Sequence, residues 1–170
     1  FAVRGHGIDE IDAAQIVATG AWTRPIAALA LGLLGDRFGI SRMALVCFVL
    51  LIVSHSLFAF TGTALGTLSM ILLNTLVTGI AIFGLRGLYF GLLEEGRMPL
   101  ALTGTAVGLV SVIGYTPDVY IAAVAGYLID QSPGLAGFQH LFMVLLGFSV
   151  VGAIAAIGFE RQARAASATA

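Results

Sequence analysis

The sequence predicts an all-α membrane protein with about five antiparallel transmembrane helices. Hydrophobic residues make up 59% of the 170 residues, charged residues make up only 10%, and the mean hydropathy is +1.03. A soluble domain carries about a quarter charged residues, so this chain has too few to cover a surface that faces water. Long apolar runs alternate with short polar connections, which is the pattern of a protein that crosses a bilayer several times.

Five apolar spans account for most of the chain. They cover residues 13–34, 43–60, 67–93, 102–129 and 138–159. A helix is the structure expected for each span, because lipid offers no hydrogen-bond partners to the backbone. Since the connections are short, neighbouring helices must run in opposite directions. We expect residues 1–12 to form an extracytoplasmic loop, residues 13–159 the transmembrane unit, and residues 160–170 a cytoplasmic tail.

Arginine is unevenly divided between the two ends of these helices, and it supplies every cation because the chain has no lysine. One end receives Arg37, Arg42, Arg97, Arg161 and Arg164. The other end receives Arg4, together with the acidic residues Asp9, Glu10, Asp12 and Asp130. The positive-inside rule therefore predicts that the arginine-rich end, which includes the C-terminus, is cytoplasmic.

Arg24 lies near the middle of the first span and is followed by Pro25. An arginine at a helix centre costs about 2.5–3.5 kcal/mol on insertion scales, so it needs a partner or an aqueous cavity. The proline removes a backbone donor, and it biases the preceding residue away from helical geometry. Because a guanidinium binds a carboxylate or phosphate through two parallel hydrogen bonds, we favour Arg24 as a substrate-binding residue for an anion. The alternative is a structural cation that a neighbouring helix neutralises.

Asp118 lies near the middle of the fourth span, on a stripe of small and polar residues. The stripe consists of Gly104, Gly108, Ser111, Tyr115, Asp118, Ala122 and Ala125. Small residues let helices approach closely, so this face is expected to point into the protein, with Tyr115 and Asp118 as candidate substrate-binding residues. Two roles of Asp118 stay open. It takes up a proton during transport, or it is structural, as the counter-ion of Arg24 or an acceptor for backbone donors near Pro117.

Other polar residues are assigned to a gate or to packing. Arg86 lies about two turns from the cytoplasmic end of the third span, where it can snorkel or pair with Asp36, Glu94 or Glu95. We favour gating or packing over substrate contact for this residue. The weaker candidates are His55, as a packing residue or proton relay, and Trp22 and Asn74, as cavity residues.

The first connection reads Gly32-x-Leu34-x-Asp36-Arg37-x-Gly39-x-x-Arg42. This pattern resembles the cytoplasmic loop motif of the major facilitator superfamily, whose weaker copy joins the eighth and ninth helices. Ile40 and Ser41 stand where the stronger copy has basic residues, which suits the weaker copy. The later stretches 86–89, 93–96, 103–106 and 113–118 resemble a bacterial subgroup of the same superfamily.

The resemblance implies that the chain is the C-terminal half, helices eight to twelve, of a twelve-helix transporter in the bacterial inner (plasma) membrane. Such a protein moves a small organic solute by alternating access of two halves, driven by protons or a second solute. It also implies a cytoplasmic gate formed by Asp36, Arg37, Arg42, Arg86, Glu94 and Glu95. The partners would be the bilayer, the solute and a missing N-terminal half, whose absence we infer from the start at Phe1, with neither methionine nor signal peptide.

Other function classes fit the sequence less well. A non-transporting assembly or sensor module is the alternative to a transporter. The sequence has no metal-spaced His/Asp cluster, no nucleophile–base pair and no phosphate-cradling loop, so we predict no enzyme, no cofactor and no metal site. A net charge of −1 without a basic patch argues against nucleic-acid binding. The lone Cys47 lies in an apolar run and is expected to be a small packing residue.

Overall fold

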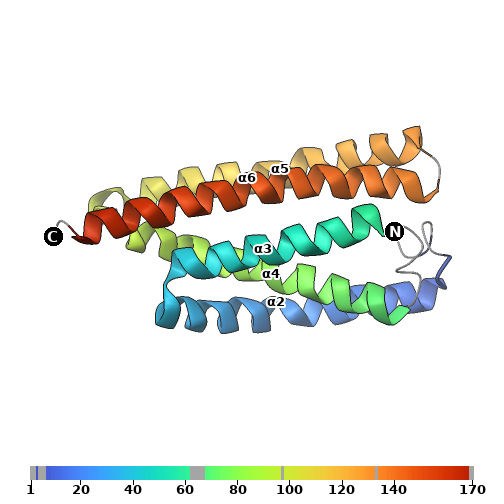
Figure 1. Cartoon of the computed structure of the whole chain (residues 1–170), viewed down its shortest axis with the longest axis horizontal. Coiled ribbons are helices and arrows are strands. Elements are labelled where there is room, and N and C mark those ends of the chain that lie inside the picture. Colours follow the sequence, from blue (N-terminus) through green and yellow to red (C-terminus); the bar gives the residue numbers. More distant parts are fainter. Residues whose placement is uncertain (1–2, 4–6, 62–67, 97, 133, 169–170) are drawn as a thin grey trace.

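Five long helices make up the described part of the chain (Figure 1). The computed structural model describes Val3 and residues 7–61, 68–96, 98–132 and 134–168. The helices are α2 (Glu10–Phe38), α3 (Ile40–Phe60), α4 (Leu68–Glu95), α5 (Leu100–Gln131) and α6 (Leu135–Ala168). Each is long and apolar enough to cross a membrane. For these residues the prediction of an all-helical protein with five membrane-length helices is confirmed.

Successive helices run in opposite directions, as the short connections predict (Figure 1). The α2–α3 turn, the end of α4, the start of α5 and the C-terminal end of α6 lie together at one end of the bundle. This is the end at which the sequence places most arginines. That it faces the cytoplasm stays a prediction. Arg4 and Arg97, which also entered that argument, lie outside the described residues.

Two helices extend well beyond their predicted spans. α2 begins at Glu10 because Asp9 caps it, with a carboxylate oxygen that accepts the Ile11 backbone N–H at 3.1 Å. α6 continues to Ala168, through most of the segment expected to be a tail. Residues 160–168 are rich in alanine and arginine, which favour a helix and let the last span continue past the apolar region.

The turn between α2 and α3 is much shorter than the gap between the first two predicted spans, which covers residues 35–42. α2 ends at Phe38 and α3 begins at Ile40, so a single residue separates them. That residue is Gly39, whose φ of 98° and ψ of 130° disfavour any side chain with a Cβ. Glycine at this position therefore allows the chain to reverse direction within one residue.

α3 is the central helix of the bundle, in contact with α2, α4 and α6. A cluster of buried apolar side chains joins α2, α3 and α4. Its members are Leu31, Ala44, Cys47, Leu51, Ala81 and Leu88. Cys47 is completely buried, so it acts as the small packing residue that the sequence led us to expect.

Buried polar side chains also tie α3 to both of its main neighbours. Asn74 Nδ2 on α4 donates to the Ser54 carbonyl at 3.1 Å, and His55 Nδ1 lies 3.0 Å from Ser149 Oγ on α6. Because the Ser149 hydroxyl already donates to the Leu145 carbonyl, at 2.8 Å, the proton in the His55 contact must belong to Nδ1. Such interhelical bonds contribute about 0.6–2 kcal/mol each in an apolar medium. Asn74 and His55 are therefore packing residues.

Large apolar side chains cover the outside of the bundle at helical spacing. On α2 the exposed residues are Trp22, Ile26, Leu29 and Leu33. On α3 they are Val46, Val49, Val53, Leu57 and Phe60. Residues three or four apart share one face of a helix, so each set forms a continuous outward stripe suited to lipid contact. Trp22, which is 75% exposed, belongs to this surface and not to a cavity.

α5 is the least enclosed helix. None of its residues is buried, and it packs along α6 while meeting α4 at few points. Figure 1 shows α5 and α6 as one layer against α2, α3 and α4. Because α4 and α5 make few contacts, the space between them is the place in the bundle that can hold a ligand.

Gly137→Ala should destabilise the α5–α6 hairpin. A Cβ at this position would lie 2.6 Å from the Ser132 carbonyl oxygen and 2.7 Å from Ile129 Cα, and backbone atoms cannot rotate away. We expect a loss of about 1–3 kcal/mol, the usual cost of overpacking, seen as a lower melting temperature in detergent. Gly147→Ala is the matched control, because nothing lies within 4 Å of a Cβ there. Equal melting temperatures of the two variants would contradict the close backbone approach.

Candidate functional site

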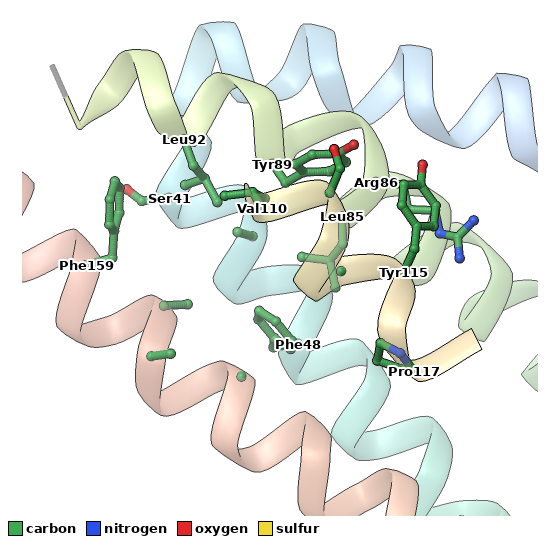
Figure 2. Close-up of a pocket in the computed structure, with 16 residues that line it drawn as sticks. Ser41, Phe48, Leu85, Arg86, Tyr89, Leu92, Val110, Tyr115, Pro117 and Phe159 are labelled. Carbon is green, nitrogen blue, oxygen red and sulfur yellow. The ribbon is translucent and has the colours of Figure 1, made fainter. Parts of the chain in front are cut away.

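A cleft of about 690 Å³ opens between α4 and α5, and α3 and α6 complete its walls (Figure 2). This volume is within the range of roughly 300–1,000 Å³ that is usual for small-molecule sites. Most lining side chains are apolar or small. Its aromatic lining residues are Phe48, Tyr89, Tyr115 and Phe159. Arg86 on α4 and Ser111 on α5 line it as well.

An ion pair lies at one end of the cleft. Arg86 Nη2 donates to Asp118 Oδ2 at 3.3 Å, which joins α4 to α5 across their sparse boundary. The guanidinium also lies over the Tyr115 ring, 5.6 Å from its centroid. The two charged side chains are 48% and 59% exposed, so the pair is open to a ligand that enters the cleft. The structure thus brings together Tyr115 and Asp118, both predicted, with Arg86.

The acidic partner of Arg86 is not one that the sequence led us to expect. Asp36, Glu94 and Glu95 were the expected partners, whereas the structure pairs Arg86 with Asp118. Arg86 precedes Glu95 by nine residues, which is about 13 Å along α4 and too far for contact with the helix end. Arg86 therefore belongs to the cleft.

Hydroxyl groups surround the same end of the cleft. Tyr89 from α4 and Ser111 and Tyr115 from α5 line the cleft with Arg86. Tyr89 was not among the site residues predicted from the sequence. Its three-residue spacing from Arg86 was the available signal, since residues three apart share a helix face.

Arg24 lies outside the cleft, at the centre of α2. Its guanidinium carbon is 5.0 Å from the centroid of the Phe83 ring on α4, and α2 remains helical through Pro25. Among the described residues, Arg24 and Asp118 form no ion pair, because Asp118 pairs with Arg86. The interpretation of Asp118 as the counter-ion of Arg24 is therefore not supported. Substrate binding by Arg24 stays a prediction.

Glu95 joins the end of α4 to the start of α3. Its Oε2 accepts the Ser41 backbone N–H and its Oε1 accepts the Ser41 hydroxyl, both at 2.7 Å. The first turn of α3 needs such an acceptor, because its N-cap residue, Gly39, has no side chain to offer. Glu95, a predicted gate residue, is thus the cap of a helix that lies 54 residues earlier in the chain.

A second polar contact at the same end links α3 to α6. Arg42 Nε donates to Glu160 Oε1 at 3.3 Å, and Arg164 pairs with the same oxygen. A smaller cavity of about 340 Å³ lies among these side chains and Glu95. Sequence analysis singled out Arg42 but gave Glu160 no role, since its spacing on α6 carries no signal of a partner on α3. Together the two contacts tie the ends of α3, α4 and α6.

The remaining predicted gate residues are exposed. Arg37 lies over the ring of its neighbour Phe38, 5.6 Å from the centroid. Within the described ranges, neither Asp36 nor Glu94 takes part in an ion pair. The gating role of these three residues stays a prediction. The described residues also contain no group of three or more His, Cys, Asp or Glu that could hold a metal ion.

Two proteins of Escherichia coli (strain K12) match about half of the chain. Inner membrane protein YihN is 31% identical over 83 residues, which cover 49% of this chain and 20% of YihN. Inner membrane protein YqcE is 32% identical over 84 residues, which cover 49% of this chain and 19% of YqcE. The match thus spans about a fifth of the length of these relatives. No family model and no solved structure matches the chain.

These comparisons contradict the assignment to the major facilitator superfamily. Neither relative is named as a member of it, and no family model supports it. The turn motif misled for a physical reason: a one-residue reversal needs the positive φ of Gly39, and arginines are favoured at any cytoplasmic helix end. The relatives and the five apolar helices together support a multi-pass inner membrane protein that is similar to YihN and YqcE over half its length.

Proposed function

We propose that the protein is a secondary active transporter that moves a small organic anion by alternating access, coupled to protons or to a second solute. The observation that carries this proposal is the Arg86–Asp118 ion pair, which opens into a 690 Å³ cleft between apolar helices. Ionisable residues inside membrane spans are costly, and they commonly mark the pathways of solutes and ions. A cleft of ligand size beside such a pair supports a solute pathway.

Alternating access also requires an end of the pathway that closes and opens. The Glu95–Ser41 and Arg42–Glu160 contacts hold three helices together at one end of the bundle. Polar contacts of this kind support a gate, because they can break and re-form without unpacking the apolar core. On the predicted orientation this gate is cytoplasmic.

We propose that a second helical unit of the same protein, N-terminal to these residues, closes the open side of the cleft. The exposed helix α5, none of whose residues is buried, supports this arrangement. The match to only about a fifth of YihN and YqcE is consistent with a longer protein. In this arrangement Arg24 and Tyr115 contribute to substrate binding, and Asp118 borders the substrate as the partner of Arg86.

A non-transporting assembly or sensor module is the second candidate. The same exposed α5 favours it, since a permanent protein partner could cover that helix. Under this alternative the Arg86–Asp118 pair is a structural link and no solute enters the cleft. Under both candidates the chain is not an enzyme.

Uptake by the full-length protein in proteoliposomes distinguishes these candidates. Radiolabelled carboxylates, sulfonates and organic phosphates would be tested with and without a pH gradient. We expect saturable uptake of at least one anion, above that of protein-free liposomes. Absence of uptake across the panel by correctly folded protein would reject the transporter in favour of the module.

Two variants then test the predicted roles of single residues. If Asp118 carries the coupled proton, Asp118→Asn should abolish the acceleration of uptake by a pH gradient, and uptake that still follows the gradient would remove that role. Arg24→Gln should raise the KM for the anion about tenfold if its guanidinium binds substrate. An unchanged KM would make Arg24 structural.

A further inference from the structure

We propose that the cleft between α4 and α5 binds an amphipathic organic anion, whose charged head competes with Asp118 for the Arg86 guanidinium. The apolar body of the ligand would fill the rest of the cleft. This inference rests on the proposed transport function. It assigns Arg86 to substrate binding, whereas the sequence favoured a gate or packing role.

Most of the hydrogen-bonding capacity of Arg86 is unused. A guanidinium has five N–H donors, and Arg86 gives Asp118 a single hydrogen bond at 3.3 Å. Charge-assisted bonds are usually about 2.7–2.9 Å, so this contact is long. Among the described residues no second acceptor binds Arg86. The guanidinium can therefore accept an incoming carboxylate or phosphate, and Asp118 is an internal ligand that can be displaced.

Hydroxyl groups lie around the Arg86 guanidinium (Figure 2). Tyr89, Ser111 and Tyr115 line the cleft together with Arg86. Figure 2 shows Tyr115 beside Arg86, with its ring next to the guanidinium. Hydroxyls can donate to an anionic oxygen that the guanidinium leaves free, whereas a cation at the same place would be repelled by the guanidinium. The polar end is thus built for an anion.

The rest of the cleft is apolar. Among the described residues that line it, Arg86 is the single charged one. Figure 2 shows Arg86, Tyr115 and Pro117 at one end, and Leu92 and Phe159 at the other. Leu92 follows Arg86 by six residues, which is about 9 Å along α4. The ligand should therefore carry one anionic head and an apolar body of similar length.

A membrane phospholipid has a related chemistry, but the dimensions favour a solute. Arg86 and Leu92, which line the two ends of the cleft on α4, are about 9 Å apart along the helix axis, whereas one leaflet of the hydrocarbon core is about 15 Å thick. The far end of the cleft is lined by Ser41, which Glu95 holds against α4. An aryl or alkyl acid of moderate size fits this space, and a full acyl chain does not.

Equilibrium binding to the purified full-length protein in phosphatidylcholine nanodiscs tests the inference. The probes are 4-phenylbutyrate, its neutral counterpart 4-phenylbutanol, and acetate, which has the charge without the apolar body. We expect 4-phenylbutyrate to bind at least about tenfold more tightly than either of the others. Equal binding of the acid and the alcohol would overturn the role of the anionic head, and equal binding of acetate would overturn that of the apolar body.

Three variants assign the effect to residues. Arg86→Gln should remove the preference for the acid over the alcohol, and the charge-balanced Arg86→Gln/Asp118→Asn pair should do the same if the single variant folds poorly. Asp118→Asn should tighten acid binding by about three- to tenfold, because the internal competitor is neutralised. Arg161→Gln, which removes an exposed arginine outside the cleft, should change nothing. Weaker acid binding by Asp118→Asn would overturn the competition.

Two further measurements distinguish this ligand class from a lipid headgroup, and ligand binding from transport. At high salt, which screens the negative surface charge of the bilayer, replacing phosphatidylcholine by phosphatidylglycerol should leave acid binding unchanged, and a marked loss of affinity would reject the solute in favour of a lipid headgroup. Arg86-dependent binding without any uptake would uphold the ligand class while rejecting transport. Uptake of an acid that fails to compete with 4-phenylbutyrate would uphold transport while rejecting this ligand class.

Discussion

Arg86→Gln should reduce anion uptake by the full-length protein about 10- to 150-fold, because a charge-assisted contact of about 1.5–3 kcal/mol is lost from the substrate complex. The Arg86→Gln/Asp118→Asn double variant should recover protein stability without recovering uptake. These two outcomes together separate the structural role of the ion pair from its role in substrate binding.

The expected recovery of stability follows from the cost of an unpaired charge in the membrane. Arg86→Gln leaves Asp118 without its 3.3 Å partner, and insertion scales place an aspartate at a helix centre at up to about 3 kcal/mol. The double variant removes both charges, so neither is left uncompensated. Water that reaches the half-exposed pair will reduce the size of the effect. Melting temperature in detergent gives the stability, and initial uptake rate at matched protein density gives the function.

Arg161→Gln is again the control for the loss of one arginine. It should alter neither the melting temperature nor the initial uptake rate. The informative contradiction is a double variant that transports normally. That result would make the Arg86–Asp118 pair purely structural and would return Arg24, at the centre of α2, as the main candidate for anion binding.

Glu95→Ala should loosen the end of the bundle at which α3, α4 and α6 meet. Both hydrogen bonds from Ser41, each 2.7 Å long, would be lost, and the first turn of α3 would lose its acceptor. Hydrogen bonds to a charged group contribute about 1.5–3 kcal/mol, so we expect the free energy of unfolding to fall by about that amount. Removing the carboxylate also removes a favourable charge from the positive end of the α3 dipole.

Cys47 reports the opening directly, because it is completely buried on α3 six residues after Ser41. Its modification by N-ethylmaleimide, followed by mass spectrometry of the peptide that contains it, should be several-fold faster in Glu95→Ala. Glu94→Ala is the matched control, since Glu94 is exposed and has no ion pair among the described residues. We expect its effect to stay within about 0.5 kcal/mol. Equal labelling of both variants would show that Glu95 does not hold this end closed.

The helical framework could be predicted because it depends on local properties of the chain. Whether a run of residues can cross a bilayer depends on its length and hydropathy, and the five predicted spans correspond to the five helices. Helix ends were less predictable. Asp9 extends α2 at its start, Gly39 reduces the turn to one residue, and α6 continues to Ala168. Each of these depends on capping or propensity, which hydropathy does not register.

The site was only partly predictable. Tyr115 and Asp118 could be selected because a polar residue at mid-span is unusual, and Arg86 was noticed for the same reason. Its partner was not found, because the depth of a residue in the membrane says nothing about the rotation of its helix or about which helix lies next to it. Phe159, which lines the cleft from α6, had no signal at all in the sequence.

The sequence by itself determined that this is a multi-pass helical membrane protein, and it marked Arg86 and Asp118 as charges that require a reason. Only the tertiary structure decided that these two residues, which are 32 positions apart in the sequence, form an ion pair with one another beside a cleft. It likewise decided that Glu95 caps a helix that starts 55 residues before it, where Gly39 cannot. The physical reason is the same in both cases. Hydropathy is a local property, whereas the partner of a charge is decided by the packing of helices that are distant in sequence.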